Sequence, residues 1–329
     1  MKNIASYPST RLRRNRKNDW SRRLVQENNL STNDLIWPIF IREGKNIIEP
    51  IKSMPGVFRY SLDKVEKLVE KSLANKIPMI TLFPSTDESK KDLKGSEALN
   101  KNNLVCKALR LIKRNYKDIG LMCDVALDPY TSHGHDGVIK NNYVDNDETI
   151  KILVKQSLLQ AEMGCDVIAP SDMMDGRVGA IRKSLDKNNF KLVQILSYAV
   201  KYASNFYGPF RDAIGSKKSL KSDKKNYQMS FFNSDEALRE VSLDIKEGAD
   251  FVMVKPGMPY LDIISKIKEN FKIPVFAYQV SGEYSIIKNG INDNLFTKDI
   301  IIETLASFKR SGASAIVTYF ANEIAKELK

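Results

Sequence analysis

Short apolar runs alternate with amphipathic stretches along most of the chain. The runs are nearly continuous in apolar residues, as is typical of parallel strands covered on both faces. They span 35–41, 79–84, 120–127, 166–171, 191–200, 251–256, 275–281 and 315–320. Between them, the apolar spacing predicts helices over 62–74, 104–116, 148–163, 234–247, 261–270 and 299–311. Gly164 and Gly248 follow two of these helices as stop signals.

The repeating strand–helix order predicts a parallel α/β fold. We expect its strands to close into a (β/α)8 TIM barrel. An open dinucleotide-binding sheet is disfavoured because no GxGxxG motif follows the first strand. The expected division is an N-terminal arm over 1–33, for subunit contacts, and a catalytic barrel domain over 34–329.

Two insertions interrupt this order, over 128–147 and 208–232. Both follow predicted strands, where the βα loops of a barrel surround the active site. The second insertion includes DAIGSKKSLKSDKKN, which is rich in Ser, Lys and Gly. That composition favours an active-site lid.

The composition is that of an ordinary soluble globular protein, with 42% hydrophobic and 28% charged residues in 329. No apolar stretch approaches the roughly 20 residues of a membrane span. The first residues lack the apolar core of a secretory signal. Cys106, Cys123 and Cys165 are too few and scattered for a disulfide framework or a zinc cluster. We therefore expect a cytoplasmic protein with no membrane partner.

The net charge of +12 raises the question of nucleic-acid binding. Much of the excess comes from single lysines scattered among Asn and Ile, as on solvated helix faces. One dense run, RLRRNRK, lies at 11–17. It lacks the interleaved aromatic residues that stack on bases, so packing on a neighbouring subunit is favoured over nucleic acid.

Lys255 is the strongest candidate for chemistry. It ends the apolar run FVMVK, and Pro256 and Gly257 follow it directly. A lysine in apolar surroundings is costly unless its amine is neutral or paired. A neutral amine can attack a ketone and form an imine. The alternatives are a lysine that reaches solvent from the strand end, or one paired with a carboxylate.

Lys201 ends the preceding run in the same way, in SYAVK. We expect the two strands that end in Lys201 and Lys255 to be adjacent, and adjacent strands lie about 4.8 Å apart. Two ammonium groups at their ends would each lower the other's pKa. Alone, Lys201 could equally be an ordinary strand-end lysine, so the pair is more specific than either member.

Six segments of the chain resemble the porphobilinogen synthase (5-aminolevulinate dehydratase) family. One is GADFVMVKPGMPY at 248–260, which contains Lys255. The others are KYASNFYGPFRDA (201–213), APSDMMDGRVGAIR (169–182), DPYTSHGHDG (128–137), SMPGVFRYS (53–61) and YQVSGEY (278–284). They run nearly the length of the chain in family order. The resemblance implies condensation of two 5-aminolevulinate molecules to porphobilinogen, with loss of two waters, in haem and tetrapyrrole synthesis. It also implies a barrel whose N-terminal arm wraps a partner, and dimers that build an octamer.

The resemblance also implies residue roles. Lys255 would hold a Schiff base with the propionate-side substrate, and Lys201 one with the acetate-side substrate. Asp124 would transfer protons beside Ser171. The remaining matches are carboxylate contacts and aromatic walls: Arg211, Lys224, Gln228, Ser281 and Tyr319 for the former, Tyr207 and Tyr278 for the latter. Lys224 stands where the family usually has Arg. Its ammonium would contact a carboxylate as a single point charge, without the two parallel hydrogen bonds that a guanidinium forms. From the residues alone, strand packing would be the preferred interpretation of the tyrosines.

The loop at 126–137 bears on metals. Zinc-dependent relatives have three cysteines where Ala126, Asp128 and Asp136 stand here, so we expect no active-site Zn²⁺. The two aspartates suit Mg²⁺ or water-mediated contacts, which resembles the aspartate-rich, magnesium-responsive branch of the family. His133 and His135 make a mixed metal cluster conceivable, and hydrogen bonding within the loop is the favoured alternative.

A second magnesium position is suggested by Glu240 and Asp244. At i and i+4 they share one helix face and could bind one cation through waters. In the resemblance, Glu240 matches a residue of an allosteric Mg²⁺ site between subunits, with Asp175 and an arm arginine such as Arg11 nearby. The alternative is a solvated acidic surface.

Two other functions remain open from the residues. One is another Schiff-base barrel enzyme of the class I aldolase type, which needs a single imine lysine. The other is a polyanion-binding protein that uses the basic arm.

Overall fold

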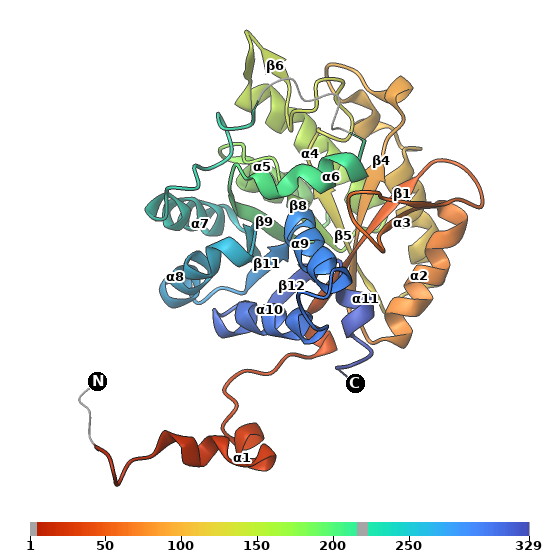
Figure 1. Ribbon diagram of the computed structural model, residues 1–329. Helices are drawn as coiled ribbons and strands as arrows, with labels where there is room; N and C mark the ends of the chain where they lie inside the picture. Colours follow the sequence, from red (N-terminus) through yellow and green to blue (C-terminus); the bar gives the residue numbers. More distant parts are fainter. Residues whose placement is uncertain (1–4, 216–222, 329) are drawn as a thin grey trace.

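The computed structural model describes residues 5–215 and 223–328. Among them, parallel strands form a closed barrel, as predicted (Figure 1). The barrel strands are β1 (Leu35–Arg42), β4 (Met79–Ser85), β5 (Gly120–Val125), β8 (Val167–Pro170), β9 (Gln194–Lys201), β10 (Phe251–Lys255), β11 (Val275–Gln279) and β12 (Ala315–Thr318). Pairing of Leu35 with Ile316 joins β1 to β12 and closes the ring. Each predicted apolar run overlaps one of these strands, with ends that agree within three residues.

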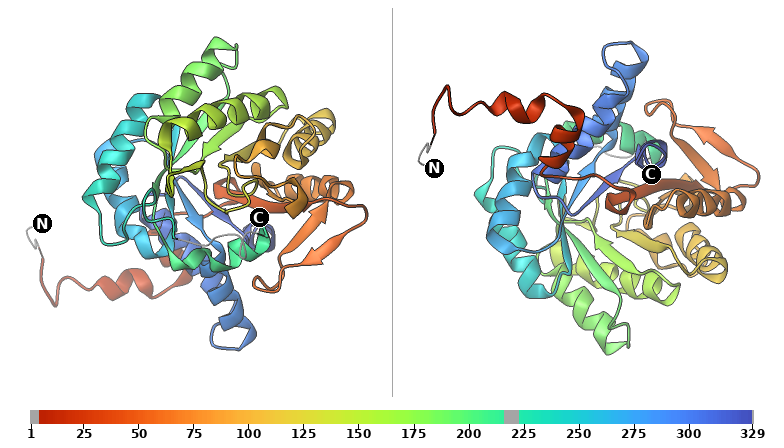
Figure 2. Two further views of the ribbon diagram at one scale, coloured as in Figure 1. Left: turned by 90° about the horizontal axis from the view of Figure 1, so that it is seen from above. Right: turned by 90° about the horizontal axis from the view of Figure 1, so that it is seen from below.

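Helices surround the strands when the barrel is viewed from above or below (Figure 2). They are α2 (Leu62–Ala74), α3 (Leu104–Asn115), α4 (Asn146–Glu162), α5 (Arg177–Lys187), α7 (Asp235–Glu247), α8 (Leu261–Phe271), α9 (Ser281–Asn292), α10 (Asp299–Arg310) and α11 (Ala321–Ile324). The six predicted helices are confirmed within two residues at either end. The pattern did not indicate α5 or α9, which both contain interior glycines that weaken the helical signal.

Helix α2 illustrates how the sequence produces this arrangement. Val65, Leu68, Val69 and Ser72 are buried, at spacings of three and four residues. That spacing places them on one face of a helix, and the face packs on the barrel. At the end of α7, Gly248 adopts φ +103°, a left-handed conformation that terminates the helix at little steric cost.

The two insertions meet above the carboxyl ends of the strands. The first contains the hairpin β6 (Ile139–Lys140) and β7 (Tyr143–Val144), and the second contains α6 (Gly208–Ala213). The Tyr143 hydroxyl donates to the carbonyl of Asn226 at 3.3 Å. Asp136 of the first insertion contacts both Lys201, at the end of β9, and Lys224 of the second insertion, so the described parts of both insertions cover the mouth, as predicted. The predicted lid also includes 216–222, which lie outside the described residues.

A further hairpin was not predicted: β2 (Ile48–Pro50) pairs with β3 (Phe58–Ser61), and β3 extends the sheet beside β1. The N-terminal arm leaves the opposite end of the barrel from α6 and β6 (Figure 1). It contains a short 3-10 helix, Leu12–Arg16, and α1 (Asp19–Leu24). Leu12, Trp20 and Leu24 are exposed on it. The arm's role in subunit contacts stays a prediction. None of the described helices combines the length and hydropathy that a membrane crossing requires.

Candidate active site

The two lysines predicted to form imines lie side by side. Lys201 is the last residue of β9 and Lys255 the last of β10, and the two are register partners in the parallel ladder. The predicted adjacency of the two strands is confirmed. Both side chains are buried, with 6% and 7% exposure respectively. The barrel therefore holds two amines at its mouth, sheltered from bulk solvent.

An irregularity in β9 controls which side chains reach this site. Ser197 pairs with Val252 and Val200 with Val254, so β9 advances three residues while β10 advances two. Such a bulge reverses the alternation of side chains along a strand. Tyr198 and Lys201 consequently point to the same site, although strict alternation would put them on opposite faces. The sequence therefore contained no clear signal for Tyr198.

The Lys255 amine lies among aromatic rings. Its Nζ is 4.6–5.6 Å from four ring centroids, those of Tyr198, Tyr207, Phe210 and Tyr278. Burial, followed by the nearby charge of Lys201, lowers the pKa of Lys255 to about 7. A substantial part of the amine is thus neutral at neutral pH, which is the form that attacks a carbonyl carbon.

The Lys201 amine has polar partners instead. It lies 3.4 Å from Asp136 Oδ2 and also donates to the backbone carbonyl of Ser171. Burial alone would raise the pKa of Asp136, but Lys201 and Lys224 outweigh it and hold that pKa well below its usual range. Asp136 is therefore ionised, and its negative charge balances the ammonium groups of Lys201 and Lys224.

Lys224 bridges two aspartates. Its Nζ is 2.8 Å from Asp136 Oδ1 and 3.3 Å from Asp128 Oδ2. Gln228 also donates to Asp136, at 3.4 Å. Burial raises the pKa of Asp128 to about 6, although Lys224 opposes the shift. Lys224 thus reaches the site as predicted, but its ammonium is held by acidic groups of the chain itself. Metal binding by Asp128 and Asp136 stays a prediction.

Asp124 lies on β5, close enough to Lys255 and Lys201 for their charges to act on it. Its Oδ1 is shielded from solvent and has no hydrogen-bond partner within the described residues. Burial raises the pKa of Asp124, while the charges of Lys255 and Lys201 and a hydrogen bond from Ser171 oppose the shift. A carboxyl with a raised pKa near two amines suits proton transfer. The structure therefore brings Asp124 and Ser171 to the predicted place.

The predicted aromatic walls surround Lys255. The Tyr207 hydroxyl donates to the carbonyl of Lys255 at 3.0 Å. The hydroxyls of Tyr278 and Tyr319 are 3.1 Å apart. The rings of Tyr278 and Tyr207 lie beside the Lys255 amine, and Tyr319 is linked to it through its hydrogen bond with Tyr278. Contacts of these tyrosines with substrate stay predictions.

Ser281 lies in the first turn of α9, and its hydroxyl is hydrogen-bonded to the loop after β9. Its hydroxyl accepts from the backbone N–H of Phe210 at 2.8 Å and lies 3.3 Å from the carbonyl of Phe206. It reaches the edge of the site, where it orders the loop that contains Tyr207. Its predicted contact with a carboxylate stays a prediction.

A hollow of about 330 Å³ joins most of these groups. It is lined by Asp128, Lys201, Tyr207, Phe210, Arg211, Lys224, Gln228 and Lys255. Arg211 comes from α6, which lies over the mouth. The hollow therefore combines two candidate nucleophiles with further cationic groups, as a substrate that has a ketone and a carboxylate requires.

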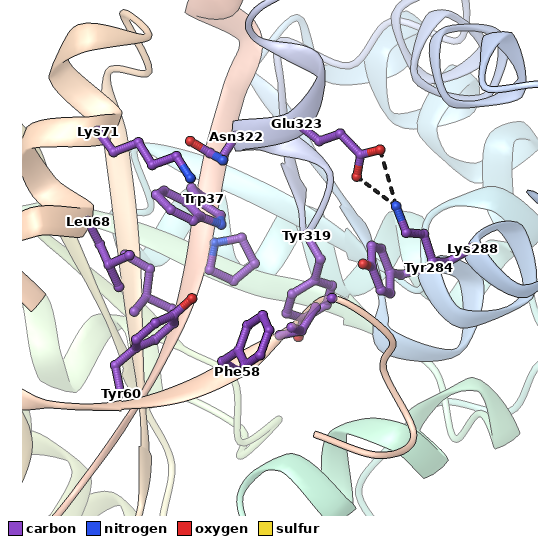
Figure 3. Close-up of a pocket in the computed structure, with 14 residues that line it drawn as sticks. Trp37, Phe58, Tyr60, Leu68, Lys71, Tyr284, Lys288, Tyr319, Asn322 and Glu323 are labelled. Carbon is purple, nitrogen blue, oxygen red and sulfur yellow. Dashed lines mark hydrogen bonds and ion pairs between the residues drawn. The ribbon is translucent and has the colours of Figure 1, made fainter. Parts of the chain in front are cut away.

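A larger hollow, of about 740 Å³, lies on the outer side of β1 (Figure 3). Trp37, Tyr60 and Leu68 line one side of it, and Lys288 lies opposite, paired with Glu323 at 2.9 Å. Neither Lys201 nor Lys255 lines this hollow. The paired amines at the barrel mouth are therefore the better candidate for chemistry.

The histidines at 133 and 135 are engaged in loop contacts. His133 Nε2 is 3.2 Å from the carbonyl of Leu93, and His135 Nδ1 is 3.1 Å from the Tyr227 hydroxyl. Burial lowers the pKa of both imidazoles. Within the described residues, no group of three or more His, Cys, Asp and Glu side chains is arranged to hold a metal ion. Within the loop, His133 Nδ1 accepts the backbone N–H of His135 at 3.2 Å, whereas Leu93 and Tyr227 lie outside it, so the alternative of hydrogen bonding in the loop describes only part of these contacts.

The predicted cation pair of Glu240 and Asp244 is wrong for Asp244. Its side chain points into the core, where it pairs with the buried Arg177 at 3.4 Å and accepts from the Ser197 hydroxyl at 2.5 Å. The i, i+4 spacing placed Asp244 on one helix face with Glu240 but could not show that α7 packs against β9 and α5 there, which buries Asp244. The sequence analysis also did not predict Arg177 as the partner of Asp244. The one indication was that Arg177 belongs to the DGRVG segment (175–179), which resembles the family.

Glu240 is partly buried and reaches a hollow instead. With Asp175 and Glu236 it lines a hollow of about 670 Å³. Burial raises the pKa of Glu240 to about 7, against the charge of Arg177, and Asp244 adds to the rise. Binding of a cation such as Mg²⁺ at Glu240 stays a prediction. Asp175 lies near Glu240, as predicted.

Comparison with known proteins agrees with this geometry. A family model described as delta-aminolevulinic acid dehydratase matches residues 9–327. The delta-aminolevulinic acid dehydratase of Bradyrhizobium diazoefficiens is 57% identical over 97% of this chain and 91% of that protein. That of Methanothermus sociabilis is 51% identical over 98% and 99%.

A solved structure is also closely similar. The crystal structure of delta-aminolevulinic acid dehydratase (porphobilinogen synthase) from Toxoplasma gondii, in complex with the reaction product porphobilinogen, superposes with a TM-score of 0.95. It is 46% identical and covers 97% of this chain and 91% of that one. The agreement of sequence, fold and paired amines leads to one assignment: the chain belongs to the delta-aminolevulinic acid dehydratase family.

Proposed function

We propose that the chain condenses two 5-aminolevulinate molecules to porphobilinogen through imines on Lys255 and Lys201. The observation that supports this most directly is the register pairing of the two lysines at the ends of β9 and β10. Each imine forms with release of one water from a ketone, so two imines account for the two waters lost overall. Attack on each imine carbon, by carbon or by nitrogen, forms a ring bond and leaves the lysine attached as an amine. Each carbon–lysine bond then breaks by elimination with loss of a neighbouring proton, which forms a double bond in the product and returns the lysine as a free amine.

The residues around the amines have separate roles in this scheme. The neutral Lys255 amine attacks the ketone of the propionate-side substrate, and Lys201 takes the acetate-side substrate. Asp124 moves protons between the reacting groups, with Ser171 beside it. Asp136 balances the charge of the Lys201 ammonium until Lys201 loses its proton and reacts with the ketone.

Carboxylate binding requires cations at the mouth of the barrel. Arg211 lines the hollow, and Lys224 would exchange its aspartate partners for a substrate carboxylate. Gln228, Ser281 and Tyr319 would supply hydrogen bonds, and Tyr207 and Tyr278 the walls. Because the ammonium of Lys224 is a point charge, it can change partners without the two parallel bonds that an arginine forms.

Metal binding and assembly extend this proposal. An allosteric Mg²⁺ would be held at Glu240, by oxygen donors that suit a hard cation. The active site would work without Zn²⁺, and any metal at Asp128 and Asp136 would have to displace Lys224. The exposed apolar residues of the arm favour packing on a second copy, and we propose an octamer built from dimers. Three buried, free cysteines are compatible with a reducing cytoplasm.

Trapping of the imines tests the main proposal. The protein is incubated with 5-aminolevulinate, reduced with borohydride and mapped by mass spectrometry. We expect adducts on both Lys255 and Lys201; no adduct on either lysine would refute the proposal. A class I aldolase would react through one lysine, and a polyanion-binding protein through none.

Substitution provides the second test. Lys255→Ala should reduce porphobilinogen formation by on the order of 10³-fold or more, as loss of a covalent nucleophile does. Circular dichroism and sizing should match the wild type. Near-normal turnover would exclude Lys255 as the nucleophile.

A further inference from the structure

Glu283 connects two turns at the mouth of the barrel. It lies in the first turn of α9, and only 2% of it is exposed. Its carboxyl oxygens accept the backbone N–H groups of Val280, Gly257 and Met258. Burial raises the pKa of Glu283 to about 8, and these hydrogen bonds oppose the rise. Val280 belongs to the turn between β11 and α9, whereas Gly257 and Met258 follow Lys255 in the turn after β10. No ion pair involves Glu283 in the described part of the chain, so its partners are these backbone groups.

The contact lies where the β-ladder stops. The last register pair between β10 and β11 is Val254 with Ala277, one residue before Lys255. On its other side, the carbonyl of Lys255 accepts from the backbone N–H of Tyr202 and from the Tyr207 hydroxyl, both at 3.0 Å. Glu283 therefore supplies, on the β11 side, the hydrogen bonds that the ladder no longer provides.

Close packing leaves both turns little freedom. A Cβ at Gly257 would lie 2.4 Å from the Phe308 ring and 3.0 Å from the carbonyl oxygen of Tyr278. A Cβ at Gly282 would lie 2.5 Å from the carbonyl oxygen of Phe206. Glycine at 257 therefore lets the turn after β10 lie directly against β11 and α10, and glycine at 282 lets α9 lie directly against the loop after β9.

We propose that Glu283 is a positioning residue for Lys255. It fixes the backbone directly after the lysine, so that the amine stays among its aromatic neighbours in the orientation needed for attack. The inference rests on the proposed imine chemistry. A displacement of about 1 Å at a reacting group can cost roughly 10²-fold in rate, so a single anchor at this place can control turnover.

The test compares Glu283→Gln with Ser285→Ala. Gln keeps the size of the side chain but replaces one accepting oxygen with an NH₂ group, which cannot accept an N–H. Glu283→Ala removes both oxygens and serves as the stronger variant. Ser285 lies on the same helix and is buried, and its hydroxyl donates at 2.8 Å to the carbonyl of Ser53, away from the turn after β10.

For Glu283→Gln we expect kcat to fall about 10- to 100-fold with KM within about threefold of wild type. In borohydride trapping, the adduct on Lys255 should fall relative to that on Lys201. Ser285→Ala should keep both kcat and the adduct ratio. A Glu283→Gln protein with lowered melting temperature but unchanged kcat and adduct ratio would overturn the inference. Absence of both adducts in the wild type would refute the proposed function instead.

Discussion

Lys201 and Lys255 are register partners on adjacent strands, yet their amines have opposite surroundings. The Lys201 amine contacts the Asp136 carboxylate and the Ser171 carbonyl. The Lys255 amine lies among aromatic rings and has a pKa of about 7. The strands thus place two identical groups together, and their neighbours make them chemically different. Lys255 is the amine that is ready to react at neutral pH.

The first prediction concerns the titration of Lys255. In the folded protein its amine loses its proton as pH rises through about 7, so its reaction with an amine-selective reagent should rise over the same range. Lys201→Ala removes a nearby positive charge and should move the midpoint upward. Rates of modification, measured by mass spectrometry from pH 5 to pH 10, test both statements. A Lys255 that reacts only above about pH 9 would contradict the assignment, because an unperturbed lysine titrates near 10.4.

The second prediction concerns Asp136, which balances Lys201 and Lys224. Asp136→Asn leaves two buried ammonium groups short of an anion, and breaking a buried pair in this way costs about 3–5 kcal/mol. Asp128→Asn is the matched control, because Asp128 contacts one ammonium and should cost less. Because the folded-state pKa of Asp136 is lowered, its contribution is complete above the unfolded pKa and declines as pH falls.

Denaturant unfolding at pH 7 and pH 3.5 measures this contribution. The difference between wild type and Asp136→Asn should be largest at pH 7 and smaller below about pH 4, where an unfolded aspartic acid becomes protonated. Equal stability of the two proteins at pH 7 would argue against the pairing.

A third prediction concerns Gly282, which lies against the loop after β9. Gly282→Ala places a Cβ 2.5 Å from the carbonyl oxygen of Phe206, and a backbone atom cannot move aside as a flexible side chain can. We expect a loss of about 1–3 kcal/mol, as for other overpacked sites, together with reduced activity. Gly208→Ala is the control, because nothing lies within 4 Å of its Cβ position. Thermal unfolding should leave that variant unchanged or slightly stabilised.

The fourth prediction concerns Mg²⁺ and Glu240. Chelation with EDTA should lower activity or change the oligomer size, and Mg²⁺ but not Zn²⁺ should restore both. Glu240→Ala should abolish the response, because it removes one of the carboxylates that line the hollow. Asp235→Ala, an exposed change on the same helix, should keep it. If EDTA alters neither rate nor size in the wild type, Glu240 does not bind a regulatory metal.

The sequence by itself determined the barrel and much of its site. Strands buried on both faces must be nearly continuous in apolar residues, so each barrel strand is visible as a run. A lysine that ends such a run is conspicuous, and Lys255 is therefore identifiable from the order of residues around it. Helices with one apolar face, such as α2, are equally visible, because their periodicity is local.

Only the tertiary structure decided what these residues contact. The bulge in β9 brings Tyr198 to Lys255, and the packing of α7 on β9 turns Asp244 inward to Arg177. Lys224 meets Asp136 across 88 residues of chain. Glu283 accepts N–H groups from two separate turns. Local periodicity encodes which face of an element is buried, whereas ion pairs, bulges and backbone anchors depend on residues far apart in sequence. Those contacts exist only once the barrel has closed.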